Sequence, residues 1–326
     1  MMTDTTLAPA AASEDLIYQL AAPAAGRAPI FAARLSGLSV SRDAGKTWRS
    51  AYASLGLKQD LPTLSVAVAP GASEPGSGRE CMVFAGYNGG VLRSLDSGQT
   101  WQTSAFRLPA PAVAALAVSP NFRADGLVFA GTLADGVFYS ADGGAHWQTG
   151  NLGLIDVNVF CLGLSPNFES DQTIFAGTHS GLFCSRTAGR SWREVSLPSG
   201  FEAVVSLALS PAFASDGTLF AGTETHGLLG STDAGRTWRR VGQAALSSSI
   251  NQIVLAPRDA GGPRLRVLHG DGALTASDDG GACWRPWQAA ELASEAVAAV
   301  LAPCGFEAGQ AVWLGLASGR VVRVRG

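Results

Sequence analysis

The octet Ser231-Thr232-Asp233-Ala234-Gly235-Arg236-Thr237-Trp238 has the pattern S-x-D-x-G-x-T-W, and close copies recur five more times in the 326 residues. The other copies are residues 41–48, 94–101, 140–147, 185–192 and 277–284. The tryptophans that end the six octets are successively 53, 46, 45, 46 and 46 residues apart. A fixed period of this length is typical of a solenoid, a propeller or another repeat array.

Each residue type in the octet has a structural use. A Ser or Asp side chain can accept hydrogen bonds from backbone N–H groups nearby and close a turn, and Gly at the fifth place tolerates positive φ. The Thr hydroxyl offers another local hydrogen bond, and Trp buries a large apolar surface. We therefore interpret the octet as a hairpin turn anchored to the core. The positions with this structural role are Ser41, Asp43, Gly45, Trp48, Ser94, Asp96, Gly98, Trp101, Ser140, Asp142, Gly144, Trp147, Ser185, Gly189, Trp192, Ser231, Asp233, Gly235, Trp238, Ser277, Asp279, Gly281 and Trp284.

Three copies depart from the pattern. Thr187 stands where Asp is expected, and His146 and Cys283 stand where Thr is expected. A catalytic motif would tolerate these changes poorly, whereas one weakened turn among six is survivable. The departures favour a structural role for the octet, and His146 is expected to hydrogen-bond locally.

The six octets resemble the Asp-box, or BNR repeat, of sialidases, sortilin-type receptors, two-domain endoglucanases and photosystem II assembly factors. This resemblance covers nearly the whole chain and implies a β-propeller. It is specific for the fold and weak for the function, because the same repeat occurs in enzymes and in binding proteins.

The spacing predicts an all-β, seven-bladed propeller with four antiparallel strands per blade, here called A to D from the centre outward. Strand A is an apolar run, strand B carries Phe-Ala-Gly, strand C leads into the octet and strand D follows its Trp. The last unit ends without an octet or a strand D, so we expect an N-terminal segment at about 5–10 to complete it and close the ring. The expected single domain, 1–326, has blades at approximately 15–58, 62–108, 112–153, 157–198, 203–245, 250–290 and 296–326.

Composition narrows the classes of function. The net charge is −3, and the basic residues are scattered rather than gathered in the stripe that nucleic acid requires. No stretch approaches 18 uninterrupted apolar residues, and residues 1–12 do not form a signal peptide. The five cysteines form no C-x-x-C motif, and most of them are interpreted as core residues. We expect a cytoplasmic, monomeric protein that binds no nucleic acid, does not insert into a membrane and uses no cofactor or metal.

The turns between strands B and C vary in a way that turn chemistry does not require. In a propeller these turns share one face with the D–A connections, while the octets and the A–B connections share the other. Variable polar loops on a rigid scaffold are the usual place for binding. The candidate binding residues on these turns are Arg34, Tyr87, Asn88, Asp135, His179, Glu224, His226 and Asp271. A solvated turn remains an equally good interpretation for any one of them.

The sequence also leaves enzymatic alternatives. The resemblance to sialidases implies an arginine triad, a Tyr–Glu pair and a Phe/Tyr-Arg-Ile-Pro motif, but the nearest segment, residues 26–30, reads Gly-Arg-Ala-Pro-Ile. A glycosidase needs two carboxylates across the scissile bond, and no such pair stands out. A metal-dependent activity would need Asp135, Glu224 and Asp271 to converge. The preferred function is therefore non-enzymatic: a scaffold that binds a protein or peptide, in the manner of an assembly or accessory factor. A glycan-binding or glycosidase-like propeller is the alternative.

Overall fold

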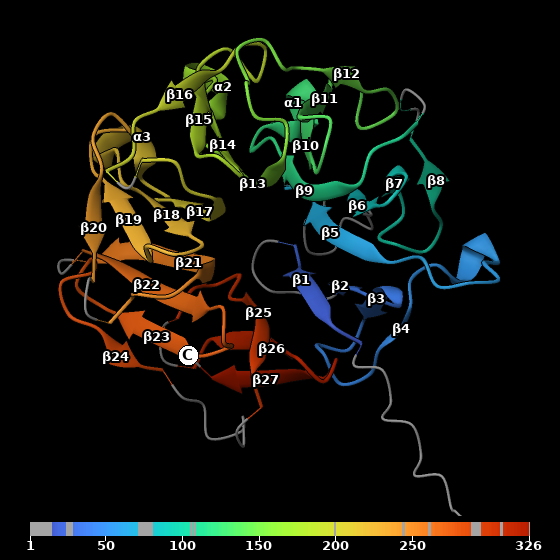
Figure 1. The fold of residues 1–326 in the computed structure, drawn as a ribbon. Coiled ribbons are helices and arrows are strands. Elements are labelled where there is room, and N and C mark those ends of the chain that lie inside the picture. Colours follow the sequence, from blue (N-terminus) through green and yellow to red (C-terminus); the bar gives the residue numbers. More distant parts are fainter. Residues whose placement is uncertain are drawn as a thin grey trace, which may run out of the picture.

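Seven antiparallel sheets stand like blades around a central axis (Figure 1). This arrangement is seen in a computed structural model that describes residues 15–23, 29–70, 81–104, 106, 109–198, 200–242, 245–259, 262–287, 295–306 and 309–325. Six sheets have four strands and the seventh has three within the described residues. The prediction of a seven-bladed β-propeller is confirmed.

The A strands surround the axis, and those of neighbouring blades contact one another. They are β1 (Ile17–Ala21), β5 (Thr63–Val68), β9 (Val113–Val118), β13 (Val159–Leu164), β17 (Val204–Leu209), β21 (Ile250–Asp259) and β25 (Val297–Leu301). The B strands are β2 (Ile30–Arg34), β6 (Val83–Tyr87), β10 (Val128–Thr132), β14 (Ile174–Thr178), β18 (Leu219–Thr223), β22 (Gly262–His269) and β26 (Ala311–Leu316).

The C and D strands lie outside them. The C strands are β3 (Gly37–Ser41), β7 (Gly90–Ser94), β11 (Val137–Ser140), β15 (Leu182–Ser185), β19 (Leu228–Ser231), β23 (Leu274–Ser277) and β27 (Val321–Arg325). The short D strands are β4 (Arg49–Ser50), β8 (Gln102–Thr103), β12 (Gln148–Thr149), β16 (Arg193–Val195), β20 (Arg239–Val241) and β24 (Arg285–Pro286). A 3-10 turn, η2 (Ala53–Leu55), lies between the first two blades.

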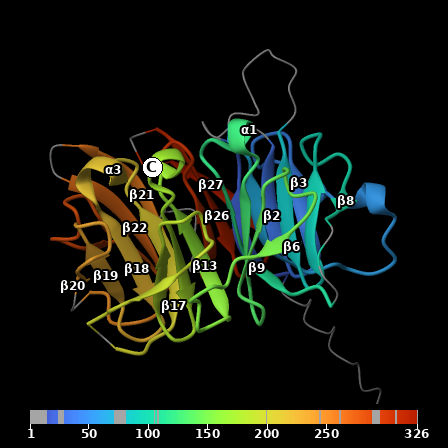
Figure 2. The same ribbon diagram turned by 90° about the horizontal axis from the view of Figure 1, so that it is seen from above.

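Three of the A–B connections contain one helical turn that the sequence did not predict. These are α1 (Phe122–Asp125), α2 (Phe168–Asp171) and α3 (Phe213–Asp216). Each is followed by a residue whose backbone adopts the left-handed conformation. In the first of them Ser119 Oγ donates to Asp125 Oδ2 at 2.5 Å. This Ser–Asp hydrogen bond closes the connection, which explains the repeated Ser-Pro-x-Phe-x-x-Asp sequence. In the side view α1 and α3 lie on the same side of the ring (Figure 2).

The core between blades is built around the Phe of strand B. Phe129 of the third blade is fully buried, and both Phe168 and Gly189 of the fourth blade lie against its ring. The Phe129 and Phe168 rings meet edge to face with centroids 5.6 Å apart, an arrangement that adds to area burial. The same contacts recur around Phe84 and Phe175. The octet glycine is therefore a contact between blades as well as a turn residue.

The first and seventh blades make an equivalent contact. Trp313 on β26 stands at the place of the strand-B Phe, and its Nε1 donates to Ala44 O of the first octet at 3.3 Å. Gly45 lies directly against the same indole. The N-terminal strand expected at about 5–10 lies outside the described residues, and it remains a prediction.

Candidate functional site

The octets use their polar side chains within the turn. In the fifth octet Ser231 Oγ donates to Asp233 Oδ1 at 2.8 Å and accepts from Gly235 N at 3.0 Å. Thr237 donates to Asp233 from both its backbone N–H and its hydroxyl. The Thr237 hydroxyl is the main cause that lowers the pKa of Asp233. A carboxylate held in this way is a turn-forming group with little capacity left for a ligand.

The three departures from the octet keep the turn closed. His146 Nδ1 lies 2.6 Å from Asp142 Oδ2, in place of the Thr hydroxyl, as expected for a local hydrogen bond. Thr187 accepts from Ser191 N at 2.9 Å, in place of the carboxylate. Cys283 N donates to Asp279 Oδ1 at 2.9 Å. Cys283 and Cys304 are exposed, so the interpretation of the cysteines as core residues does not extend to these two.

The turns between strands B and C and the D–A connections lie together on the other face, here called the B–C face. Backbone hydrogen bonds join them, as from His179 N to Asn158 O and from Glu224 N to Ala203 O. Asp135, His179, Glu224, His226 and Asp271 are exposed there.

Arg34 differs from the other candidate residues because it is buried. Its Nη1 donates to Gly319 O of the last blade at 2.7 Å and lies 3.3 Å from Asp15 Oδ2. The guanidinium also lies over the Trp48 ring at 5.5 Å. Arg34 thus ties the first blade to the last. Tyr87 is half-buried, and Asn88 forms an isolated bridge with Ala112.

Carboxylates in the D–A connections close the turns of the same blade, and sequence reasoning missed them. Glu202 Oε1 accepts from Thr225 N and His226 N, and its Oε2 lies 2.6 Å from His226 Nδ1. Burial raises the pKa of Glu202, but the hydrogen bonds from His226 and Thr225 outweigh it and lower that pKa to about 2. The related groups are Asp15, Asp156 and Glu295, which bond to Ser36, Ser180 and Ser318. An acidic residue two or three positions before strand A was the available signal.

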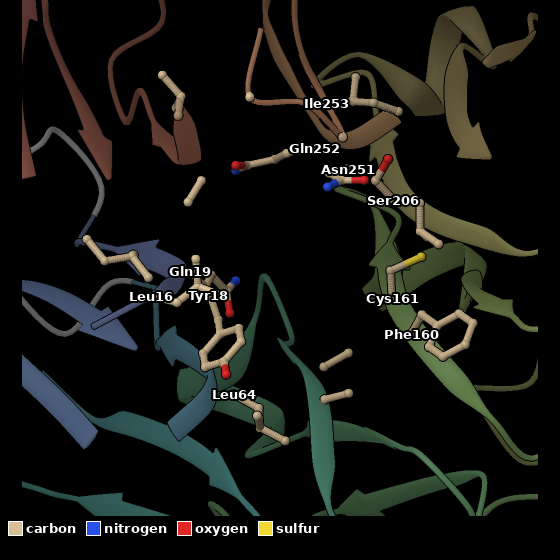
Figure 3. A pocket seen from close by; sticks show the side chains of 18 of the residues that line it. Leu16, Tyr18, Gln19, Leu64, Phe160, Cys161, Ser206, Asn251, Gln252 and Ile253 are labelled. Carbon is tan, nitrogen blue, oxygen red and sulfur yellow. The ribbon is translucent and has the colours of Figure 1, made fainter. Parts of the chain in front are cut away.

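A cavity of about 620 Å³ occupies the centre of the ring, lined by all seven A strands. Each A strand has a register shift after its first residue, which identifies a β-bulge. Bulges redirect side chains and leave one residue unpaired in the ladder. The bulge residues all line the cavity and are Tyr18, Leu64, Ala114, Phe160, Val205, Asn251 and Ala298. Figure 3 shows Tyr18 and Gln19 on β1 across the cavity from Phe160 and Cys161 on β13.

Two of the predicted residues meet in a second, smaller space. His179 and Glu224 line a hollow of about 340 Å³ together with Ser180, Phe201, Glu202, Ala203 and Thr225. Phe201, which the sequence did not single out, is 82% exposed at this hollow. The His179 ring in turn contacts Phe160 of the central cavity, with centroids 6.3 Å apart. We call this space the Phe201 hollow.

The predicted carboxylates do not converge. Within the described part of the chain no three His, Cys, Asp or Glu side chains are placed to hold a metal ion. Asp271 lines the central cavity, whereas Glu224 lines the Phe201 hollow and Asp135 lies in neither. His269 packs within its blade, with Nδ1 3.0 Å from Ser248 Oγ, and burial lowers its pKa. None of the described helices is long and apolar enough to cross a membrane.

Comparison with known proteins supports the fold. No protein-family model matches the chain, and no curated protein sequence matches it. Among solved structures, the chain is similar to the extracellular domain of BT4673 from B. thetaiotaomicron (TM-score 0.69, 15% identical, 97% of this chain and 39% of that chain). It is also similar to YCF48 bound to D1 peptide (0.67, 18%, 96% and 94%) and to the Niastella koreensis GH74 enzyme (0.74, 15%, 95% and 52%). The chain therefore spans about two fifths of the BT4673 domain. At these identities the likeness establishes a propeller and nothing finer.

Proposed function

We propose that this propeller is a non-enzymatic scaffold that binds a protein or peptide at the B–C face, in an assembly or accessory role. The observation that carries the proposal is the central cavity and its seven bulged strands. Its bulge residues combine apolar side chains with a polar Asn251, and bulges leave backbone groups free of the ladder. Apolar walls with a few polar groups suit an extended peptide.

Two further observations support this proposal. Among the lining residues in the described part of the chain, Asp271 supplies the one carboxylate, whereas glycoside hydrolysis requires a pair. YCF48, a propeller that matches this chain over 96% of its length, has been solved with D1 peptide bound. A peptide therefore fits a propeller of this size, although the two sequences are only 18% identical.

Affinity capture from the native cell tests the proposal, with the wild-type chain, Tyr18→Ala and Arg236→Ala as baits. Tyr18 is a bulge residue that is 39% exposed, and Arg236 is an exposed octet residue on the opposite face. We expect a partner that the wild-type chain and Arg236→Ala both retain and that Tyr18→Ala loses. Identical partners for all three baits would contradict binding at the central cavity.

A further inference from the structure

The Phe201 hollow presents an aromatic ring and a carboxylate without a cation between them. Phe201 is 82% exposed in the D–A connection that leads into β17, and Glu224 is exposed in the B–C turn of the same blade. No Lys or Arg is among the described residues that line the hollow. Within the described residues the Glu224 carboxylate has no hydrogen bond or ion pair. Both groups are available to an outside molecule.

Elsewhere the protein holds its own arginines with this pair of groups. Arg266 lies over the Phe306 ring at 4.7 Å, and its Nη1 is 2.9 Å from Asp278 Oδ1. Arg34 likewise lies over Trp48 and pairs with Asp15. A guanidinium can stack on an aromatic face and donate to a carboxylate at the same time. The Phe201 hollow has both components of these two sites but no arginine of the described chain.

The charge of the B–C face favours a cationic partner. The described B–C turns and D–A connections carry Asp15, Asp60, Asp135, Asp156, Glu202, Glu224, Asp271 and Glu295. Their cationic side chains are Arg34, Lys58 and Arg320, and two of these are already paired with Asp15 and Glu295. An excess of carboxylates attracts cationic segments and opposes anionic ones.

From these observations we propose that the Phe201 hollow binds an arginine side chain of a partner protein. The guanidinium lies against Phe201 and pairs with Glu224. The contact between His179 and Phe160 joins the hollow to the central cavity, so apolar residues that flank the arginine can reach the cavity mouth. This inference rests on the proposed function, because it specifies the partner of the same face.

Two labelled nonapeptides that alternate leucine with either arginine or citrulline test the proposal by fluorescence anisotropy with the full-length chain. Citrulline keeps the shape of arginine but not its charge. We expect the arginine peptide to bind about tenfold more tightly, because only arginine can make both a cation–π contact with Phe201 and an ion pair with Glu224. Glu224→Gln and Phe201→Ala should each remove much of this preference.

Matched controls lie on the same face. Asp135→Asn removes an exposed carboxylate outside the hollow, and Leu133→Ala removes a side chain of the same B–C turn that is 39% exposed outside the hollow. Both variants should keep the preference for arginine. Equal binding of the two peptides, no binding of either, or an equal loss with Asp135→Asn and Glu224→Gln would overturn the proposal. Loss of a captured partner with Tyr18→Ala but not with Glu224→Gln would leave the proposed function intact and reject the arginine site.

Discussion

The two faces of the ring differ in how they use their side chains. On the octet face, polar groups bond within each turn, and Gly189 and Trp192 fill space against the preceding blade. On the B–C face, neighbouring turns are closed by different groups, and Phe201 and Glu224 project outward. Similar residue types therefore have different roles on the two faces. Substitutions on the octet face should affect folding, whereas substitutions on the B–C face should affect binding.

The largest expected difference concerns two aromatic residues. Trp192 is 4% exposed, and its Nε1 donates to Gly150 O of the preceding blade at 2.7 Å, whereas Phe201 is 82% exposed. Trp192→Ala should lower the free energy of unfolding by about 3–5 kcal/mol through loss of buried surface and creation of a cavity. Phe201→Ala should change it by about 0.5 kcal/mol or less. Urea unfolding of both variants measures the difference, and similar losses would contradict the assignment of roles to the two faces.

Two glycines with similar backbone angles allow a finer comparison. Gly235 of the fifth octet has φ +79° and lies against the buried Phe175 ring, while Gly200 on the B–C face has φ +73° and no atom within 4 Å of an added Cβ. Each Gly→Ala change costs about 1–2 kcal/mol for the left-handed conformation. Gly235→Ala should lose about 1–3 kcal/mol more, because Phe175 must move. Equal thermal midpoints for the two variants would show that the octet glycine is needed only for its backbone angle.

The sequence predicted the blades because each unit packs against its neighbours through the same residue types at the same positions. It indicated that the octet Gly and Trp are constrained, but periodicity alone cannot tell which neighbouring blade they contact. Arg34 ends its strand B where three other blades have a buried Thr. Its hydrogen bond to Gly319 depends on ring closure across 285 residues. Phe201 lies in a D–A connection without a repeated pattern, so only the folded structure shows that it is exposed beside Glu224.

The smallest expected effect concerns the octet carboxylates in acid. Burial raises the pKa of Asp96, but the hydrogen bonds from Thr100 and Ser94 outweigh it and lower that pKa to about 2, from an ordinary value of 3.8. A carboxyl group whose pKa is lower when folded contributes stability above its unfolded pKa and loses it as the pH falls toward the folded value. Asp96→Thr copies the fourth octet, in which Thr187 accepts the same backbone hydrogen bond. This variant should therefore be slightly less stable at pH 7 and should lose less stability between about pH 4 and pH 2 than the wild-type chain.

Thermal midpoints across this range measure how steeply stability falls with pH, with Thr187→Val as the control that alters an octet without changing the number of carboxylates. If Asp96→Thr leaves the change of thermal midpoint with pH unaltered, the octet carboxylate shapes the turn but does not contribute to the loss of stability in acid.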